Sequence, residues 1–104
     1  MSLETKNEIE KHMFSVGIGI NALELRRYLG RKRTSQMKTF RKYLKNTERY
    51  TLSRYPKEEG NLNEIFSELK ENMGKKKHKK SLLLVSKLYI NLEKIYDEIY
   101  PKEL

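Results

Sequence analysis

The sequence contains no cysteine and no tryptophan, only two prolines, and a single alanine, Ala22. Without cysteine the chain can form neither a disulfide nor a thiolate metal site, which is typical of proteins in a reducing compartment. Its longest apolar stretches, 14–20 and 82–85, are far shorter than the roughly 20 residues that a membrane-spanning helix needs. The first ten residues carry three glutamates and do not resemble a secretory signal. We therefore expect a soluble, cytoplasmic protein that is free to associate with the nucleoid.

Motifs for catalysis and cofactor binding are also missing. A chain of 104 residues is too short for the large nucleotide-binding folds, and it has no glycine-rich phosphate loop and no nucleophile elbow. Its two histidines, His12 and His78, have no second ligand at metal-binding spacing. The carboxylates Glu64, Glu68 and Glu71 fit an exposed acidic flank of one helix better than a magnesium site. We expect a protein that is not an enzyme and has no cofactor and no metal.

The sequence does contain an excess of positive charge, and this excess lies in the middle of the chain. Lysine and arginine number 23 against 14 acidic residues, which gives a formal charge of +9. Residues 1–20 sum to −1, residues 21–60 to +8 and residues 61–104 to +2. Such a local concentration of cations is typical of a surface that binds a polyanion. A solvated face without a ligand is the alternative interpretation.

The first third of the chain predicts two helices separated by a short strand. Residues 3–14 place apolar side chains near one face of a helix. Residues 15–20 alternate aliphatic side chains with serine and glycine, which is the period of a strand and a poor helix composition. Asn21 is a good N-cap for a helix over 22–29, and Gly30 would close that helix.

The middle third predicts a basic helix followed by an extended segment. A helix from Thr34 or Ser35 to about Asn46 has an apolar stripe on one side and a cationic polar face opposite it. Residues 48–55 alternate apolar and polar side chains and are rich in strand formers, so we expect a short strand or extended arm. The segment 56–60 contains proline and glycine and would break it.

The last third predicts two helices joined by a basic connector. The first of them is capped by Asn61 or Asn63 and ends at Gly74. Residues 75–80 are five lysines and a histidine, and a block of like charge predicts a mobile connector. We therefore divide the chain into a basic domain over 1–74, the connector at 75–80, and a C-terminal packing or dimerisation helix over 81–104.

The C-terminal helix carries a regular apolar seam. Its positions step by three and four residues, as in a helix that packs along its length. They are Val85, Leu88, Leu92, Ile95 and Ile99. Because this seam is long for so small a protein, we expect a homodimer or a protein partner to bind through it. The alternative is that the seam completes the core of its own chain.

The segment from Asn21 to Asn46 resembles the helix-turn-helix of DNA-binding proteins: it combines an eight-residue helix, a glycine at the turn and a polar-faced second helix. With the strand-like residues 16–20 before it and 50–55 after it, the element order is similar to that of a winged-helix domain. The resemblance implies a mainly α fold with at most two short strands and a long C-terminal helix. It also implies that the helix from Ser35 enters the major groove of DNA.

The same resemblance implies which side chains would contact DNA. Candidates to face base edges are Ser35, Gln36, Lys38, Thr39 and Lys42. Candidates to contact phosphates are Arg26, Arg27, Arg31, Lys32, Arg33, Lys45, Arg49, Arg54 and Lys57. Tyr50 and Tyr55, which lie next to arginines, are the candidates for stacking on single-stranded bases.

These observations favour a small DNA-binding transcriptional regulator that binds double-stranded DNA. The alternative is a non-catalytic accessory subunit of a DNA replication, DNA processing or ribonucleoprotein complex, which contacts the nucleic-acid backbone and docks through its C-terminal helix. Binding of RNA is a third interpretation.

Overall fold

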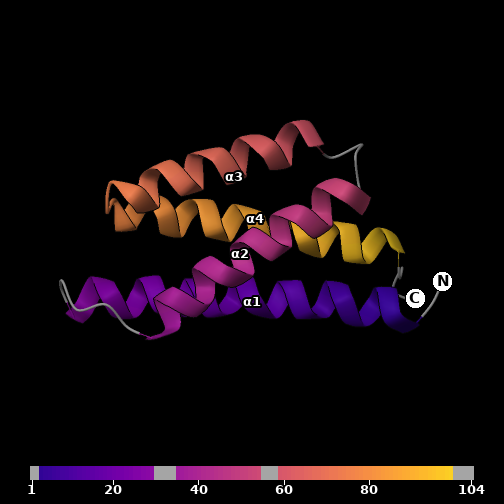
Figure 1. Ribbon diagram of the computed structural model, residues 1–104, viewed down its shortest axis with the longest axis horizontal. Helices are drawn as coiled ribbons and strands as arrows, with labels where there is room; N and C mark the ends of the chain where they lie inside the picture. The colour runs from indigo at the N-terminus through magenta and orange to yellow at the C-terminus, as the bar shows by residue number, and fades with distance from the viewer. Residues whose placement is uncertain (1–2, 30–34, 55–58, 100–104) are drawn as a thin grey trace.

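The computed structural model describes residues 3–29, 35–54 and 59–99, and these residues form four helices and the turn at 75–77. The helices are α1 (Leu3–Leu29), α2 (Ser35–Arg54), α3 (Glu59–Gly74) and α4 (His78–Ile99), shown in Figure 1. Within these ranges no residue lies in a strand. The mainly α prediction is confirmed as an all-α, four-helix protein. The two expected strands are wrong.

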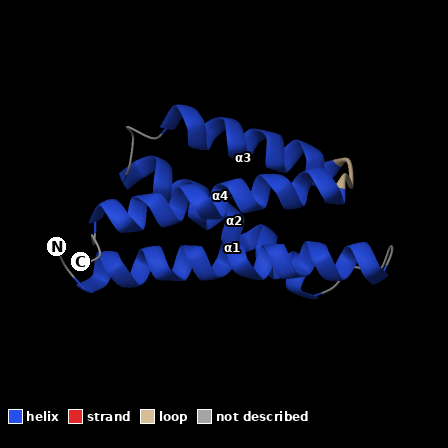
Figure 2. Ribbon diagram, turned by 180° about the vertical axis from the view of Figure 1, so that it is seen from behind, coloured by secondary structure: helices blue, strands red, loops and turns tan. Residues whose placement is uncertain are grey.

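Helices that follow one another in the chain run antiparallel (Figure 1). Together they form one elongated body of 43 × 24 × 24 Å. α4 lies between α1 and α3, as Figure 2 shows from behind. α2 packs on α1 and crosses the front of the body obliquely (Figure 1). Because of this tilt, α2 contacts α3 over a much smaller area than it contacts α1.

One hydrophobic core joins all four helices. Its largest fully buried side chains are Phe40 of α2, Phe66 of α3 and Leu23 of α1. The seam expected along the C-terminal helix is present, and Val85, Leu88, Leu92 and Ile95 are all buried. The side chain of Ile99 is outside the described side chains. α4 therefore completes the core of its own chain, and a partner could reach the four buried seam residues only if the bundle opened.

The first expected strand, 16–20, lies in the middle of α1. One of the two glycines that suggested a strand, Gly19, has a packing role instead. A Cβ atom built on Gly19 would overlap the ring of Phe40 in α2. Because glycine has no Cβ, the two helices can approach closely at this point. Asn21 is therefore inside a continuous helix, and the separate helices expected over 3–14 and 22–29 are one.

The second expected strand, 48–55, is helical to Arg54. Thr47 and Thr51 are buried and continue the apolar spacing of Met37, Phe40 and Leu44 along the same face of α2. The hydroxyl of Thr51 donates a hydrogen bond to the carbonyl oxygen of Thr47 at 2.9 Å. This bond satisfies a polar group inside the core, so threonines that favour strands elsewhere are accommodated in a helix.

The lysine-rich segment expected as a mobile connector at 75–80 is mostly structured. α3 ends at Gly74, and the amide of Lys77 donates to the carbonyl oxygen of Asn72 at 2.9 Å. The amide of Lys76 donates to the carbonyl oxygen of Met73 at 3.1 Å, and Lys76 has a φ of 60°. This is the bonding of a Schellman motif, in which a left-handed residue ends a helix. The last three residues of the segment, 78–80, already belong to α4.

Candidate nucleic-acid interface

The solvent side of α2 is strongly basic. α2 carries six cations against one carboxylate, Glu48. Five of the six cations lie within an arc of about 100° when each residue turns the helix by 100°. These five exposed residues, which we call the α2 cation stripe, are Lys38, Arg41, Lys42, Lys45 and Arg49.

The stripe is a consequence of how α2 packs. Met37, Phe40 and Leu44 point into the core, and the stripe occupies a neighbouring arc of the helix that remains in solvent. From Lys38 to Arg49 the helix rises about 16 Å. That length corresponds to roughly five phosphates along one strand of B-form DNA, which are spaced about 3.4 Å along the axis.

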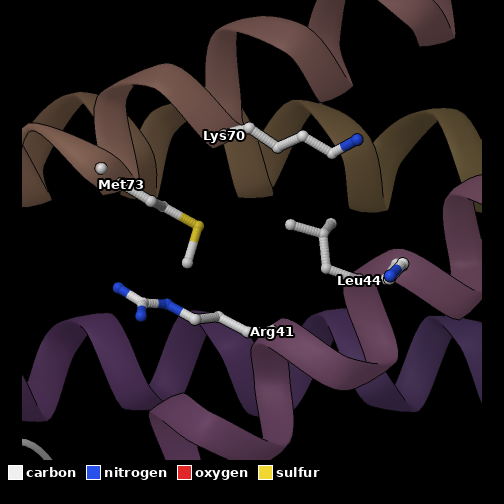
Figure 3. A pocket seen from close by; sticks show the side chains of 6 residues that line it. Arg41, Leu44, Lys70 and Met73 are labelled. Atoms are coloured by element: carbon white, nitrogen blue, oxygen red, sulfur yellow. The ribbon is translucent and has the colours of Figure 1, made fainter.

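A hollow of about 390 Å³ separates α2 from α3 beside the stripe. Leu44 of α2 and Met73 of α3 point toward one another across it, and Arg41 and Lys70 lie at its sides (Figure 3). Lys70 also forms an ion pair with Glu48 of α2, so the one carboxylate of α2 is engaged by α3. The hollow therefore combines an apolar floor with cationic edges and is continuous with the stripe through Arg41 and Lys45.

Arg54, a phosphate candidate, points to the other side of α2. Its guanidinium lies 3.8 Å from a carboxylate oxygen of Glu8 in α1 and 5.4 Å from the centre of the Tyr50 ring. The Tyr50 ring is itself stacked on His12, with ring centroids 4.4 Å apart. The structure thus places Arg54 and Tyr50 at the junction of α1 and α2, away from the stripe. One face of the Tyr50 ring is therefore occupied by His12 and is closed to a base.

Arg26, another phosphate candidate, is buried and only 5% exposed. Its place along α1 follows from the antiparallel register, because the hydroxyl of Tyr96 donates to a carboxylate oxygen of Glu10 at 3.3 Å. Arg26 lies sixteen residues after Glu10 in α1, and sixteen residues before Tyr96 in α4 is the first turn of that helix, so the two are level. The pKa of His78 there is lowered, first by burial and then by the positive charge of Arg26. In this position Arg26 is unsuited to contact a phosphate, whereas Arg27 is exposed.

The remaining candidates divide into those that the structure describes and those that it does not. Gln36, Lys38, Thr39 and Lys42 are exposed on α2, as the predicted polar face requires. Of these, Lys38 and Lys42 belong to the stripe. Lys45 and Arg49, expected on phosphates, are exposed on the same stripe. Arg31, Lys32, Arg33, Lys57 and Tyr55, and the side chain of Ser35, are outside the described residues.

Two basic residues were missed by the sequence analysis. Arg41 falls between Lys38 and Lys45 on the same helical arc, and its spacing of three and four residues from them would have identified it. Lys70 comes from α3, and no local pattern places it opposite α2. Only the antiparallel packing of the two helices brings it there.

The described residues contain no group of three or more histidine or acidic side chains placed to hold a metal ion. Glu71 accepts a bond from the Lys75 ammonium at 2.8 Å, and this hydrogen bond is the main reason that its pKa is lowered. Glu64 and Glu68 are exposed on the same helix.

Comparison of the chain with known protein families, with curated proteins and with solved structures gave no match. None of the described helices has both the length and the apolar composition needed to cross a membrane.

Proposed function

We propose that this protein binds double-stranded DNA through α2 and acts as a small transcriptional regulator. The observation that carries the proposal is the α2 cation stripe, five exposed cations on one arc of a helix whose only carboxylate pairs with Lys70. Cations arranged in this way can neutralise several phosphates at once, which is the main source of affinity for DNA.

The position of α2 suits insertion into a groove. The helix crosses the outside of the body, and its outward face is covered by no other described helix (Figure 1). The major groove of B-form DNA is about 12 Å wide and admits one α-helix. In this proposal α2 acts as the reading helix that the helix-turn-helix resemblance implies, and it follows α1 in the chain. All five cations of the stripe suit phosphates, and the forked donors of Arg41 and Arg49 can each bind two oxygens of one phosphate.

The proposal is tested by removing two charges on the stripe and two elsewhere. Lys42→Gln with Lys45→Gln removes exposed cations of α2, and Lys87→Gln with Lys94→Gln removes the same charge from exposed positions of α4. We expect the α2 pair to weaken binding of a duplex by at least about tenfold, or 1.4 kcal/mol, at one fixed salt concentration. The α4 pair should change it by less than about twofold.

Two outcomes would overturn the proposal. Equal losses in both variants would mean that net charge, and not the stripe, drives binding. Tighter binding of single strands or RNA than of duplex DNA at the same salt would assign the stripe to RNA instead.

The second candidate function is that of an accessory subunit of a larger nucleic-acid complex. It is favoured by Phe14 and Tyr28 of α1, which are 71% and 82% exposed and are typical of a surface that another protein covers. Selection from a random pool of duplexes distinguishes the two functions. A regulator enriches a defined site, whereas a subunit that only contacts the backbone enriches none.

A further inference from the structure

α1 is apolar on two sides. Its inner side packs in the core through Ile9, Val16 and Leu23. Its outer side carries a second stripe, in which positions step by four and three residues and most side chains are exposed. This α1 outer stripe consists of Phe14, Ile18, Asn21, Leu25 and Tyr28. Three of its members, Phe14, Leu25 and Tyr28, are large exposed hydrophobic residues. No charged residue lies between Met13 and Leu23.

The N-terminal half of the α1 outer stripe is hollow. A depression of about 440 Å³ is lined by Phe14, Gly17, Ile18 and Asn21, with Tyr89 of α4 on its far side. A Cβ built on Gly17 meets no atom within 4 Å, so Gly17 is the open floor of this depression. Residues at positions i, i+3, i+4 and i+7 form the hole that receives one side chain of a facing helix in knobs-into-holes packing.

The C-terminal half of the stripe supplies a side chain of the right kind. Leu25 is 40% exposed and lies two turns beyond the depression on the same arc. One surface therefore presents both a hole and a knob, and a two-fold axis between them would bring each hole against a knob. Interfaces with this property are self-complementary, as in most homodimers.

We propose that the α1 outer stripe is the interface of a homodimer in which two copies of α1 pack antiparallel about an axis at Asn21. In this arrangement the partner's Leu25 enters the depression over Gly17. Phe14 lies opposite the partner's Tyr28, and the two Asn21 side chains meet on the axis. A pair of amides at such a position can bond to each other, and a single polar residue in an apolar seam fixes the register of paired helices. The inference goes beyond the proposed function and does not depend on it.

The charge pattern favours a second copy over a lipid surface. Helices that lie on membranes carry lysine and arginine along the borders of their apolar face. On α1 the residues that border the stripe are of both signs, Lys6 and Lys11 as well as Glu10 and Glu24, and the stripe itself is uncharged. The sequence analysis expected a homodimer through Val85 and Leu88 of α4. Those side chains are buried in the core, so the interface proposed here lies on α1 instead.

The absence of cysteine from the chain permits a direct test by cross-linking. Asn21→Cys places one thiol on the proposed axis, and Ser67→Cys places one on the exposed surface of α3 as a control. We expect mild oxidation to convert the Asn21→Cys protein to a covalent dimer while the Ser67→Cys protein remains monomeric. A mixture of Phe14→Cys and Tyr28→Cys proteins should cross-link to each other more than either does to itself, because the helices are antiparallel.

A second variant separates loss of the interface from loss of folding. Gly17→Glu puts a charge over the depression, its Cβ would meet no atom within 4 Å, and glutamate favours a helix more than glycine does. We expect this protein to keep its helical circular dichroism and to be monomeric in sedimentation velocity, where the unchanged chain is a dimer. A monomeric unchanged chain would overturn the proposal, and so would a dimer that Gly17→Glu leaves intact or equal cross-linking of the two single-cysteine proteins.

Discussion

The Nδ1 atom of His12 in α1 lies 2.8 Å from the Oγ1 atom of Thr47 in α2, within hydrogen-bonding distance. The same imidazole is stacked on Tyr50 one turn further along α2. These two contacts, together with Phe40 against Gly19, define how α2 is rotated about its own axis. The rotation matters because it turns Met37 and Leu44 into the core and leaves the α2 cation stripe in solvent.

The first prediction concerns the pH dependence of stability. The pKa of His12 is lowered by its burial, then by Lys11, with Glu8 acting in the opposite direction. The unfolded chain therefore binds more protons than the folded one near and below the ordinary histidine pKa of about 6.5. We expect the free energy of unfolding to fall as pH decreases through that value. Urea titrations at a series of pH values measure this.

His12→Gln is the variant that identifies the group responsible. It should flatten the decline below pH 6.5, because glutamine does not titrate. His78→Gln is the comparison variant: the pKa of His78 is lowered too, so this variant should remove only the share of the decline that His78 contributes and leave the share of His12. An unchanged pH dependence in His12→Gln would contradict the assignment.

The second prediction compares the two glycines of α1. Gly19→Ala should lower the free energy of unfolding by about 1–3 kcal/mol, because the added methyl group overlaps Phe40. Gly17→Ala should raise it by up to about 1 kcal/mol, since its Cβ enters open space and alanine favours a helix. Chemical denaturation of both proteins measures the difference. Equal effects would mean that the close approach of α1 and α2 at Gly19 is wrong.

The third prediction concerns the end of α3. Lys76 has a φ of 60°, a conformation that costs most side chains roughly 1–2 kcal/mol. Lys76→Gly should therefore stabilise the protein by about 0.5–1 kcal/mol even after the greater flexibility of glycine in the unfolded chain is counted. Lys77→Gly removes the same charge one residue later and should destabilise by a similar amount. Thermal unfolding of the two variants side by side is the measurement.

The fourth prediction concerns Arg26, whose Nε atom is buried with no hydrogen-bond partner. No ion pair among the described residues joins Arg26 to a carboxylate. Arg26→Met should leave the free energy of unfolding unchanged or raise it, by up to about 2 kcal/mol, because an apolar side chain of similar length replaces a desolvated charge. Arg27→Met, at an exposed site, should change it by less than about 0.5 kcal/mol.

Arg26→Met should also change a second measurable quantity, the pKa of His78. Because the charge of Arg26 helps to lower the pKa of His78, Arg26→Met should raise that pKa toward the ordinary histidine value. Titration of the imidazole by NMR measures the change, and Arg27→Met serves again as the control. A strongly destabilised Arg26→Met protein would instead mean that the guanidinium makes bonds that hold α1 to α4.

Regular apolar spacing was the reliable signal in this sequence. The steps of three and four residues in α4 predicted its helix and placed Val85 and Leu92 on one apolar face, although that face packs in the core and was expected to bind a partner. The polar face of α2 was expected from Met37, Phe40 and Leu44. These patterns succeed because they follow the geometry of the helix itself.

The failures came from residues whose role depends on a neighbouring helix. Gly19 was taken as a sign of a strand, yet it is required by Phe40, which is 21 residues further along the chain. Thr51 was taken as a strand former, yet its hydroxyl bonds within the helix. Arg26 was placed on a surface by its charge, whereas the antiparallel register of α1 and α4 buries it. Local composition contains none of this information.

The dependence of DNA binding on salt tests the central claim most directly, because it counts the phosphates that the protein neutralises. If the five cations of the α2 cation stripe each displace one counterion from a duplex, the slope of log K against log salt is about −4.5. Lys42→Gln with Lys45→Gln should reduce that slope in magnitude by about 1.8, whereas Lys87→Gln with Lys94→Gln should leave it unchanged. A flat dependence in the unchanged protein would contradict the account.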